Sequence, residues 1–172
     1  MGTGQMLLTV FAIILLGNII LTTNRGISNS SQVLTQTSIG IDCVSLATST
    51  IEKAQRLPFD EHTKDSTWQN SLTALTPPAS LGQEHPGDTL SDYDDYNGYP
   101  GGPNGSRTET DPLLTGIYKV MTQVHYVTRD ASGNFVISTG SATWSKRLDI
   151  WVWNTADPTD TVKMTDIFSY WY

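Results

Sequence analysis

The first 24 positions of the chain carry no charged side chain, and they contain an almost unbroken apolar run, Met6–Leu21. With 16 residues, this run is slightly shorter than the roughly 20 that a helix needs to cross a bilayer. From Asn29 to Leu57, apolar or small residues recur mostly three and four positions apart, which is the period of one helix face. We therefore predict one helix over 6–57, about 78 Å long, that ends before Pro58.

After Leu114 the apolar period changes from 3.6 to 2, which predicts β-strands. Short connections, among them DASGN at 130–134 and the proline-started turn DPTD at 157–160, require antiparallel neighbours. The predicted strands are 118–126, 135–139, 143–154 and 161–171.

One face of this sheet is expected to pack on the second half of the helix, around Ala47, Ile51 and Ala54. The other face is rich in tryptophan, which is too much aromatic surface to be left exposed. Either the connecting region, another subunit or a host surface should cover these side chains: Trp151, Trp153 and Trp171.

Residues 58–115 are rich in proline and glycine, as in TPP, HPGD and NGYPGGPNGS, and predict a connecting region with one short helix at 65–75. The expected fold class is α+β, with a long N-terminal helix packed on a C-terminal antiparallel sheet, in the form of a ladle. We divide the chain into an apolar helix half, 1–28, and a head, 29–172. The head comprises an amphipathic helix half, the connecting region and the sheet: 29–57, 58–115 and 116–172.

Composition excludes several classes of protein. The 10 Lys and Arg against 17 Asp and Glu give a net charge of -7, so no basic cluster exists to neutralise nucleic-acid phosphates. The single cysteine, Cys43, excludes an internal disulfide and any CxxC motif. The three scattered histidines show no metalloenzyme spacing. We expect a non-enzymatic, hydroxyl-rich surface protein with 24 Thr and 16 Ser.

A helix with a wholly apolar front half needs a cover that the remaining residues are too few to provide. Lipid, or identical copies of the chain, would supply it. A secretory signal peptide is disfavoured, because the run lacks a basic residue before it and a small-residue cleavage site after it. Gly17, Asn18 and Gly26 are candidate helix breaks, where we expect either local unwinding or close approach of another helix.

A neutral apolar helix that continues amphipathically to about residue 55 and precedes an antiparallel sheet resembles the type IV pilins and pseudopilins. In that family a prepilin peptidase removes a basic leader, and MGTGQMLLTVFAIILL is similar to the opening run of the mature chains. The resemblance places Met1 at the processed, methylated position and Gln5 where most members carry glutamate. The stretches DCVSLATSTIEKAQRLPFD and DYDDYNGY are also similar to pilin-like proteins of environmental bacteria.

The resemblance implies a structural subunit of a type IV pilus-like filament, a helical polymer on the cell surface. It implies an inner-membrane intermediate, and as partners a prepilin peptidase, the assembly machinery and other copies of the chain. The expected filament-core residues are Met1, Gln5, Met6, Leu7, Leu8, Val10, Phe11, Ile13, Ile14, Leu15, Leu16, Ile19, Ile20 and Leu21. Two alternatives stay open: a minor pseudopilin of a type II secretion-like system, and a single-pass membrane-anchored surface protein that binds sugar or protein.

The stretch LSDYDDYNGYPG gathers oxygen-bearing side chains, and hard cations such as Ca²⁺ prefer oxygen ligands in short glycine-containing loops. The alternative is a solvated turn whose side chains cap local amides, with nothing to raise a pKa for acid–base catalysis. The nearby tyrosines are expected to pack on the sheet. No other cofactor is expected, and the candidate Ca²⁺ ligands are Asp88, Asp92, Asp94, Asp95 and Asn97.

Overall fold

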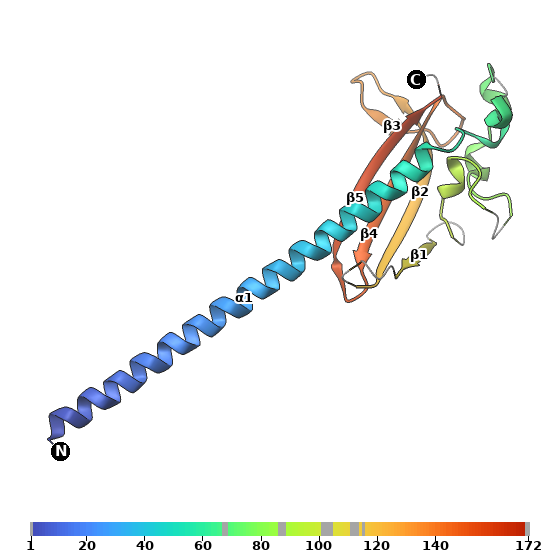
Figure 1. Ribbon diagram of the computed structural model, residues 1–172. Helices are drawn as coiled ribbons and strands as arrows, with labels where there is room; N and C mark the ends of the chain where they lie inside the picture. The colour runs from blue at the N-terminus through green and yellow to red at the C-terminus, as the bar shows by residue number, and fades with distance from the viewer. Residues whose placement is uncertain are drawn as a thin grey trace. The chain divides into compact units, whose positions relative to one another are not determined.

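The computed structural model describes residues 2–66, 69–85, 89–100, 105–110, 114 and 116–170. It consists of one long helix followed by short 3₁₀-helices and an antiparallel sheet, so the predicted α+β class is confirmed (Figure 1). The elements are α1 (Thr3–Gln55), η1 (Glu61–Ser66), η2 (Leu72–Ala74), η3 (Pro78–Ser80), η4 (Asp94–Tyr96), β1 (Ser106–Glu109), β2 (Tyr118–Arg129), β3 (Phe135–Ile137), β4 (Ser145–Asn154) and β5 (Asp157–Ser169).

The chain divides into two compact units, Met1–Ile39 and Gly40–Tyr172. From Thr3 onward the first unit is helix, whereas the second contains the last part of α1, the connecting region and the sheet. This division groups residues that pack together. The division predicted at residue 28 is a different one, between an anchoring helix half and a head, and it stays a prediction.

Helix α1 continues without a break through Gly17, Asn18 and Gly26, which corrects the unwinding expected at these residues. The Asn18 side-chain amide donates to the Ile14 carbonyl at 3.1 Å, so one of its donors bonds within its own helix and does not compete with the helix backbone. A glycine costs only about 1 kcal/mol in a helix, which the surrounding turns tolerate. Close approach of a second helix at Gly17 stays a prediction. The helix ends at Gln55, before Pro58 as expected.

The sheet has the order β1-β2-β4-β5, with β3 paired to β2, and the pairings are antiparallel as predicted. Strand β1 was not expected from the sequence. The connection between β4 and β5 lies at Thr155 and Ala156, so the turn predicted at 157–160 is wrong, and Pro158 instead lies near the start of β5. The β4–β5 register passes from Thr161 to Asp157 and leaves Pro158 without a partner, so a proline on this edge strand sacrifices no ladder hydrogen bond.

Within the second unit, the buried residues of α1 are small: Cys43, Ala47, Thr50 and Ala54. Small side chains let the helix lie close to the sheet, and hydrogen bonds cross the interface. The Tyr118 hydroxyl donates to Asp42 Oδ2 at 2.9 Å, and Arg107 Nη2 donates to Thr50 Oγ1 at 2.6 Å. The predicted packing around Ala47, Ile51 and Ala54 is confirmed for the two alanines, which are buried, whereas Ile51 is half-buried.

The connecting region covers the other end of the buried sheet face. Phe59, Leu75 and Tyr126 form a buried cluster there. Tyr93 and Tyr96 are buried, and the Tyr93 ring lies 5.0 Å from that of Phe168, which confirms their predicted packing on the sheet. One continuous helix at 65–75 is not formed, because the described residues show η1 and η2 as separate 3₁₀-helices.

The opposite sheet face carries Trp151 and Trp153, both half-buried. The Lys163 ammonium lies 4.9 Å from the centre of the Trp151 ring, a cation–π contact that covers part of it. Trp171 lies outside the described residues. What else covers this face stays a prediction.

Candidate functional site

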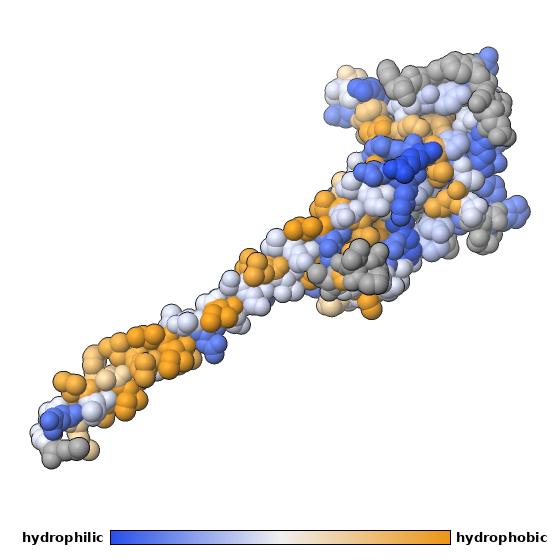
Figure 2. Space-filling view, viewed as in Figure 1, coloured by the Kyte–Doolittle hydropathy of each residue, from blue (hydrophilic) through white to orange (hydrophobic). Residues whose placement is uncertain are grey.

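The most exposed apolar surface of the described residues belongs to the front part of α1. Figure 2 shows hydrophobic side chains gathered over this part of the helix. We call Met6–Leu21 the apolar segment. The exposed fractions of its large apolar side chains range from 47% for Leu15 to 72% for Leu7. Among the described residues, every large apolar side chain predicted for the filament core is exposed in the single chain: Met6, Leu7, Leu8, Val10, Phe11, Ile13, Ile14, Leu15, Leu16, Ile19, Ile20 and Leu21.

Polar side chains within and just after the apolar segment bond back to their own helix. Thr9 Oγ1 donates to the Gln5 carbonyl at 3.0 Å, Thr22 Oγ1 to Asn18 at 2.8 Å, and Thr23 Oγ1 to Ile19 at 2.9 Å. A donor that is satisfied by a carbonyl one turn earlier can enter an apolar medium without a lost hydrogen bond. These residues therefore leave the segment compatible with lipid or with the side of another apolar helix.

By length and composition, α1 is able to cross a membrane once, and the apolar stretch that meets this test lies entirely exposed near the N-terminus. The first charged side chain after it is Arg25. Gln5 is exposed at its start, and Met1 lies outside the described residues. This surface is the first candidate functional site.

The second candidate is the acidic turn around η4. Asp92, Asp94 and Asp95 are 0%, 0% and 1% exposed, so the alternative of a solvated turn is wrong. Burial raises the pKa of Asp92, and the charges of Asp94 and Asp95 raise it further, to about 8, against an opposing effect of Lys146. The expectation that nothing raises a pKa here is also wrong.

The predicted Ca²⁺ ligands do not act as one set. Asn97 bridges two segments, since its amide donates to the Leu81 carbonyl at 2.8 Å and its Oδ1 accepts from the Val124 amide at 3.1 Å. Asp95 Oδ2 accepts from the Ser91 amide at 2.6 Å. Asp94 forms an ion pair with a buried lysine. Asp88 lies outside the described residues.

That lysine is Lys146, whose side chain is completely buried in β4. Its Nζ lies 2.9 Å from Asp60 Oδ2 and 2.5 Å from Asp94 Oδ1, and it donates to the Phe59 carbonyl at 2.7 Å. Burial acts to raise the pKa of Asp60, but the ammonium outweighs it and lowers that pKa to about 2. The sequence analysis did not single out Lys146. Its position two residues before the buried Leu148 places both side chains on the same face of β4, and this signal could have identified it.

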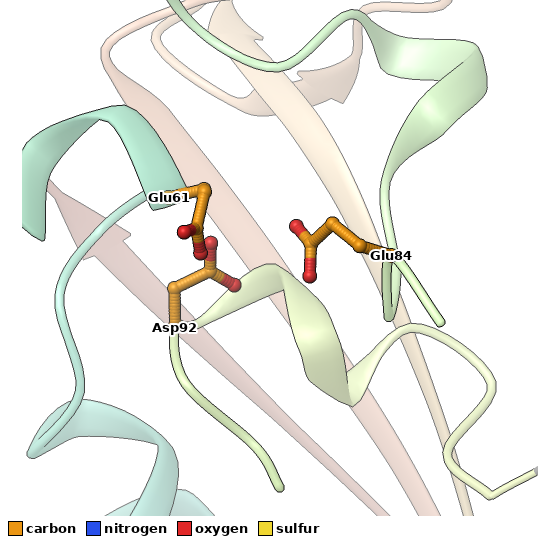
Figure 3. Close-up of side chains that lie close together, drawn as sticks. All are labelled: Glu61, Glu84 and Asp92. Atoms are coloured by element: carbon orange, nitrogen blue, oxygen red, sulfur yellow. The ribbon is translucent and has the colours of Figure 1, made fainter. Parts of the chain in front are cut away.

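Asp92 instead lies with two glutamates that the sequence did not single out. Carboxylate oxygens of Glu61, Glu84 and Asp92 all lie within 4.8 Å of one another. Figure 3 shows the three carboxylates pointing toward one another from three segments of the connecting region. Glu61 is half-buried and Glu84 exposed, so solvent reaches the group from the Glu84 side. We call these three residues the acidic triad.

The chain matches no protein-family model, no curated protein and no solved structure. A long apolar N-terminal helix whose last part packs on an antiparallel sheet is compatible with a pilin-like architecture.

Proposed function

We propose that this protein is a structural subunit of a type IV pilus-like extracellular filament, assembled through the apolar segment of α1. The observation that carries the proposal is that no residue of the apolar stretch is buried in the single chain. An apolar surface of this extent needs a partner. Because it runs along one helix, it suits either acyl chains or the helices of identical subunits.

The energy of burial is large enough for a durable polymer. Removing about 1000 Å² of apolar helix surface from water contributes on the order of 25 kcal/mol, before association costs of roughly 4–15 kcal/mol. Transfer from lipid to a filament core gains far less, because lipid is as apolar as leucine, so helix packing must decide that step. This is the reason that an inner-membrane intermediate and an assembly machinery belong to the proposal.

The same exposed helix suits a minor pseudopilin or a single-pass anchor for a surface binding protein. Both alternatives differ from the proposal in what is found outside the cell. A filament subunit is abundant in long fibres, a minor pseudopilin is scarce in short ones, and an anchored binding protein stays single in detergent.

The test is negative-stain microscopy of sheared surface material from cells that express the chain, with mass spectrometry of the fibres. We expect fibres built of this chain, and their loss in Ile14→Asn, which places an amide in the apolar segment. Gln36→Asn introduces the same side chain at an exposed polar position and should assemble normally. Fractionation checks that both variants reach the membrane. Absence of the chain from fibres, or normal assembly of Ile14→Asn, would contradict the proposal.

A further inference from the structure

The acidic triad combines three carboxylates with a buried oxygen that lacks a partner. Asp92 is 0% exposed, and within the described part of the chain its Oδ2 has no hydrogen-bond partner. An unpaired buried carboxylate oxygen is costly, so it calls for a proton or a cation. We propose that Glu61, Glu84 and Asp92 bind a Ca²⁺ ion. This inference is independent of the filament proposal.

The turn itself orients Asp92 toward the other two carboxylates. Asp92 Oδ1 accepts from the Asp95 amide at 3.1 Å, while the Asp92 amide donates to Asp95 Oδ2 at 3.2 Å. These reciprocal bonds fix one oxygen of Asp92 on the turn. The second oxygen, Oδ2, is left for a ligand.

The spacing of the triad fits a calcium ion. Oxygens that share one Ca²⁺ at 2.3–2.6 Å lie at most about 5 Å apart, and the triad oxygens lie within 4.8 Å. Ca²⁺ accepts six to eight oxygens in irregular geometry, so water can complete the shell on the exposed side at Glu84. Mg²⁺ demands a shorter, nearly octahedral shell, which three carboxylates from separate irregular segments do not readily provide.

The ammonium of Lys64 competes with a bound Ca²⁺ ion for the Glu61 carboxylate. Lys64 Nζ contacts Glu61 Oε2 and donates to Ser91 Oγ at 2.6 Å, so without a cation the ammonium neutralises part of the triad. Its side chain is 26% exposed and can move outward when the ion binds. We therefore expect moderate affinity, with a Kd of about 10⁻⁴–10⁻³ M, the range typical of extracellular calcium modules.

The test uses the full chain in a nonionic detergent, freed of metal with a chelator and titrated at pH 8 with CaCl₂ by calorimetry. Tb³⁺ luminescence excited through tyrosine gives a second readout, since Tyr93 follows Asp92 directly. A parallel titration uses MgCl₂. We expect Ca²⁺ to bind with the stated Kd and Mg²⁺ to bind more weakly.

Variants locate the ion. Glu84→Gln changes an exposed side chain and Glu61→Gln a half-buried one, so neither should unfold the protein. Each should weaken Ca²⁺ binding roughly tenfold or more. Glu52→Gln, an exposed glutamate on α1, is the matched control and should bind as the parent does.

Three results would overturn the inference. They are the absence of Ca²⁺ uptake by the parent chain at millimolar concentration, equal affinity for Mg²⁺, and equal Ca²⁺ affinity of Glu84→Gln and Glu52→Gln. The first would mean that a shared proton, not a metal, neutralises Asp92. Asp92→Asn gives an independent check, because it should abolish the Tb³⁺ signal while tryptophan fluorescence reports whether the fold is kept.

Discussion

The Lys146 ammonium lies 2.9 Å from Asp60 Oδ2 at a point where neither side chain is exposed to solvent. Lys146 belongs to β4, whereas Asp60 follows the end of α1. The same carboxylate accepts from the Thr76 amide at 3.1 Å and from the Tyr126 hydroxyl at 3.3 Å. The pair therefore ties the start of the connecting region to the centre of the sheet.

Replacing Lys146 with methionine should destabilise the second unit by about 3–5 kcal/mol, because Asp60 and Asp94 are left as uncompensated buried charges. Thermal unfolding followed by tryptophan fluorescence measures this, since all five tryptophans lie in Gly40–Tyr172. Lys163→Met is the control. That ammonium is 53% exposed and 3.8 Å from Asp149, so its loss should cost less than about 1 kcal/mol. Equal effects of the two substitutions would contradict a special role for the buried pair.

Asp60 should also govern stability in acid. Its pKa is about 2 in the folded chain and 3.8 in the unfolded chain, so it stabilises the fold above pH 3.8, and this contribution is lost as the pH falls through 2. The titratable groups that interact with Asp60 are Lys146, Asp94, Tyr126 and His62. Asp60→Asn should lower stability at neutral pH and show a smaller further loss between pH 4 and 2. Denaturation at stepwise pH values measures the difference, and parallel curves for the two chains would disprove the assignment.

In the metal-free chain, Asp92 should make the fold less stable as the pH rises, which is opposite to the effect of Asp60. Its folded pKa of about 8 lies above the unfolded value, so its contribution is complete below pH 3.8 and is lost as the pH rises through 8. Its charged neighbours are Asp94, Asp95 and Lys146, besides Glu61 and Glu84 of the triad. We expect the Tm with chelator to fall between pH 6 and 9, and added Ca²⁺ to raise it more at pH 9 than at pH 6. Asp92→Asn should remove both effects.

The helix and the antiparallel order of the main strands were predictable because periodicity is a local property of the sequence. Strand β1, Ser106–Glu109, was not, since SRTE has no apolar alternation and gains its strand character from pairing with β2. The sequence DPTD favours a turn on residue preference alone. An edge position for Pro158 is a property of the assembled sheet, which local preference does not contain.

The candidate metal site was predictable only in part. The acidic turn was visible in the sequence, but its burial was not, because the packing of Tyr93 and Tyr96 on the sheet draws the intervening carboxylates inward. Glu61 and Glu84 come from separate segments with no motif spacing to Asp92. Their convergence depends on how 3₁₀-helices and proline turns fold the connecting region, which no periodicity encodes.

Gly17 offers a test of how the apolar segments pack. A Cβ added at Gly17 would meet no atom within 4 Å in the single chain, and the same is true of Gly40. Each change to alanine should favour the helix by about 1 kcal/mol. The filament proposal predicts that a neighbouring helix approaches closely at Gly17, so Gly17→Ala should reduce fibre assembly and Gly40→Ala should leave it unchanged. Equal assembly would contradict a close helix contact at Gly17, while circular dichroism in detergent confirms that both helices are intact.

Lys64 should control the affinity of the acidic triad. Its ammonium lies against Glu61 and so competes with a bound cation for the same carboxylate. Lys64→Gln removes that charge but keeps a donor within reach of Ser91, and it should therefore strengthen Ca²⁺ binding several-fold. Lys53→Gln, at an exposed position on the last turn of α1, is the matched loss of one positive charge and should change the affinity little. Calorimetric titrations of the two variants at one ionic strength decide the point. Weaker Ca²⁺ binding in Lys64→Gln would mean that the lysine positions Glu61 for the ion instead of competing with it.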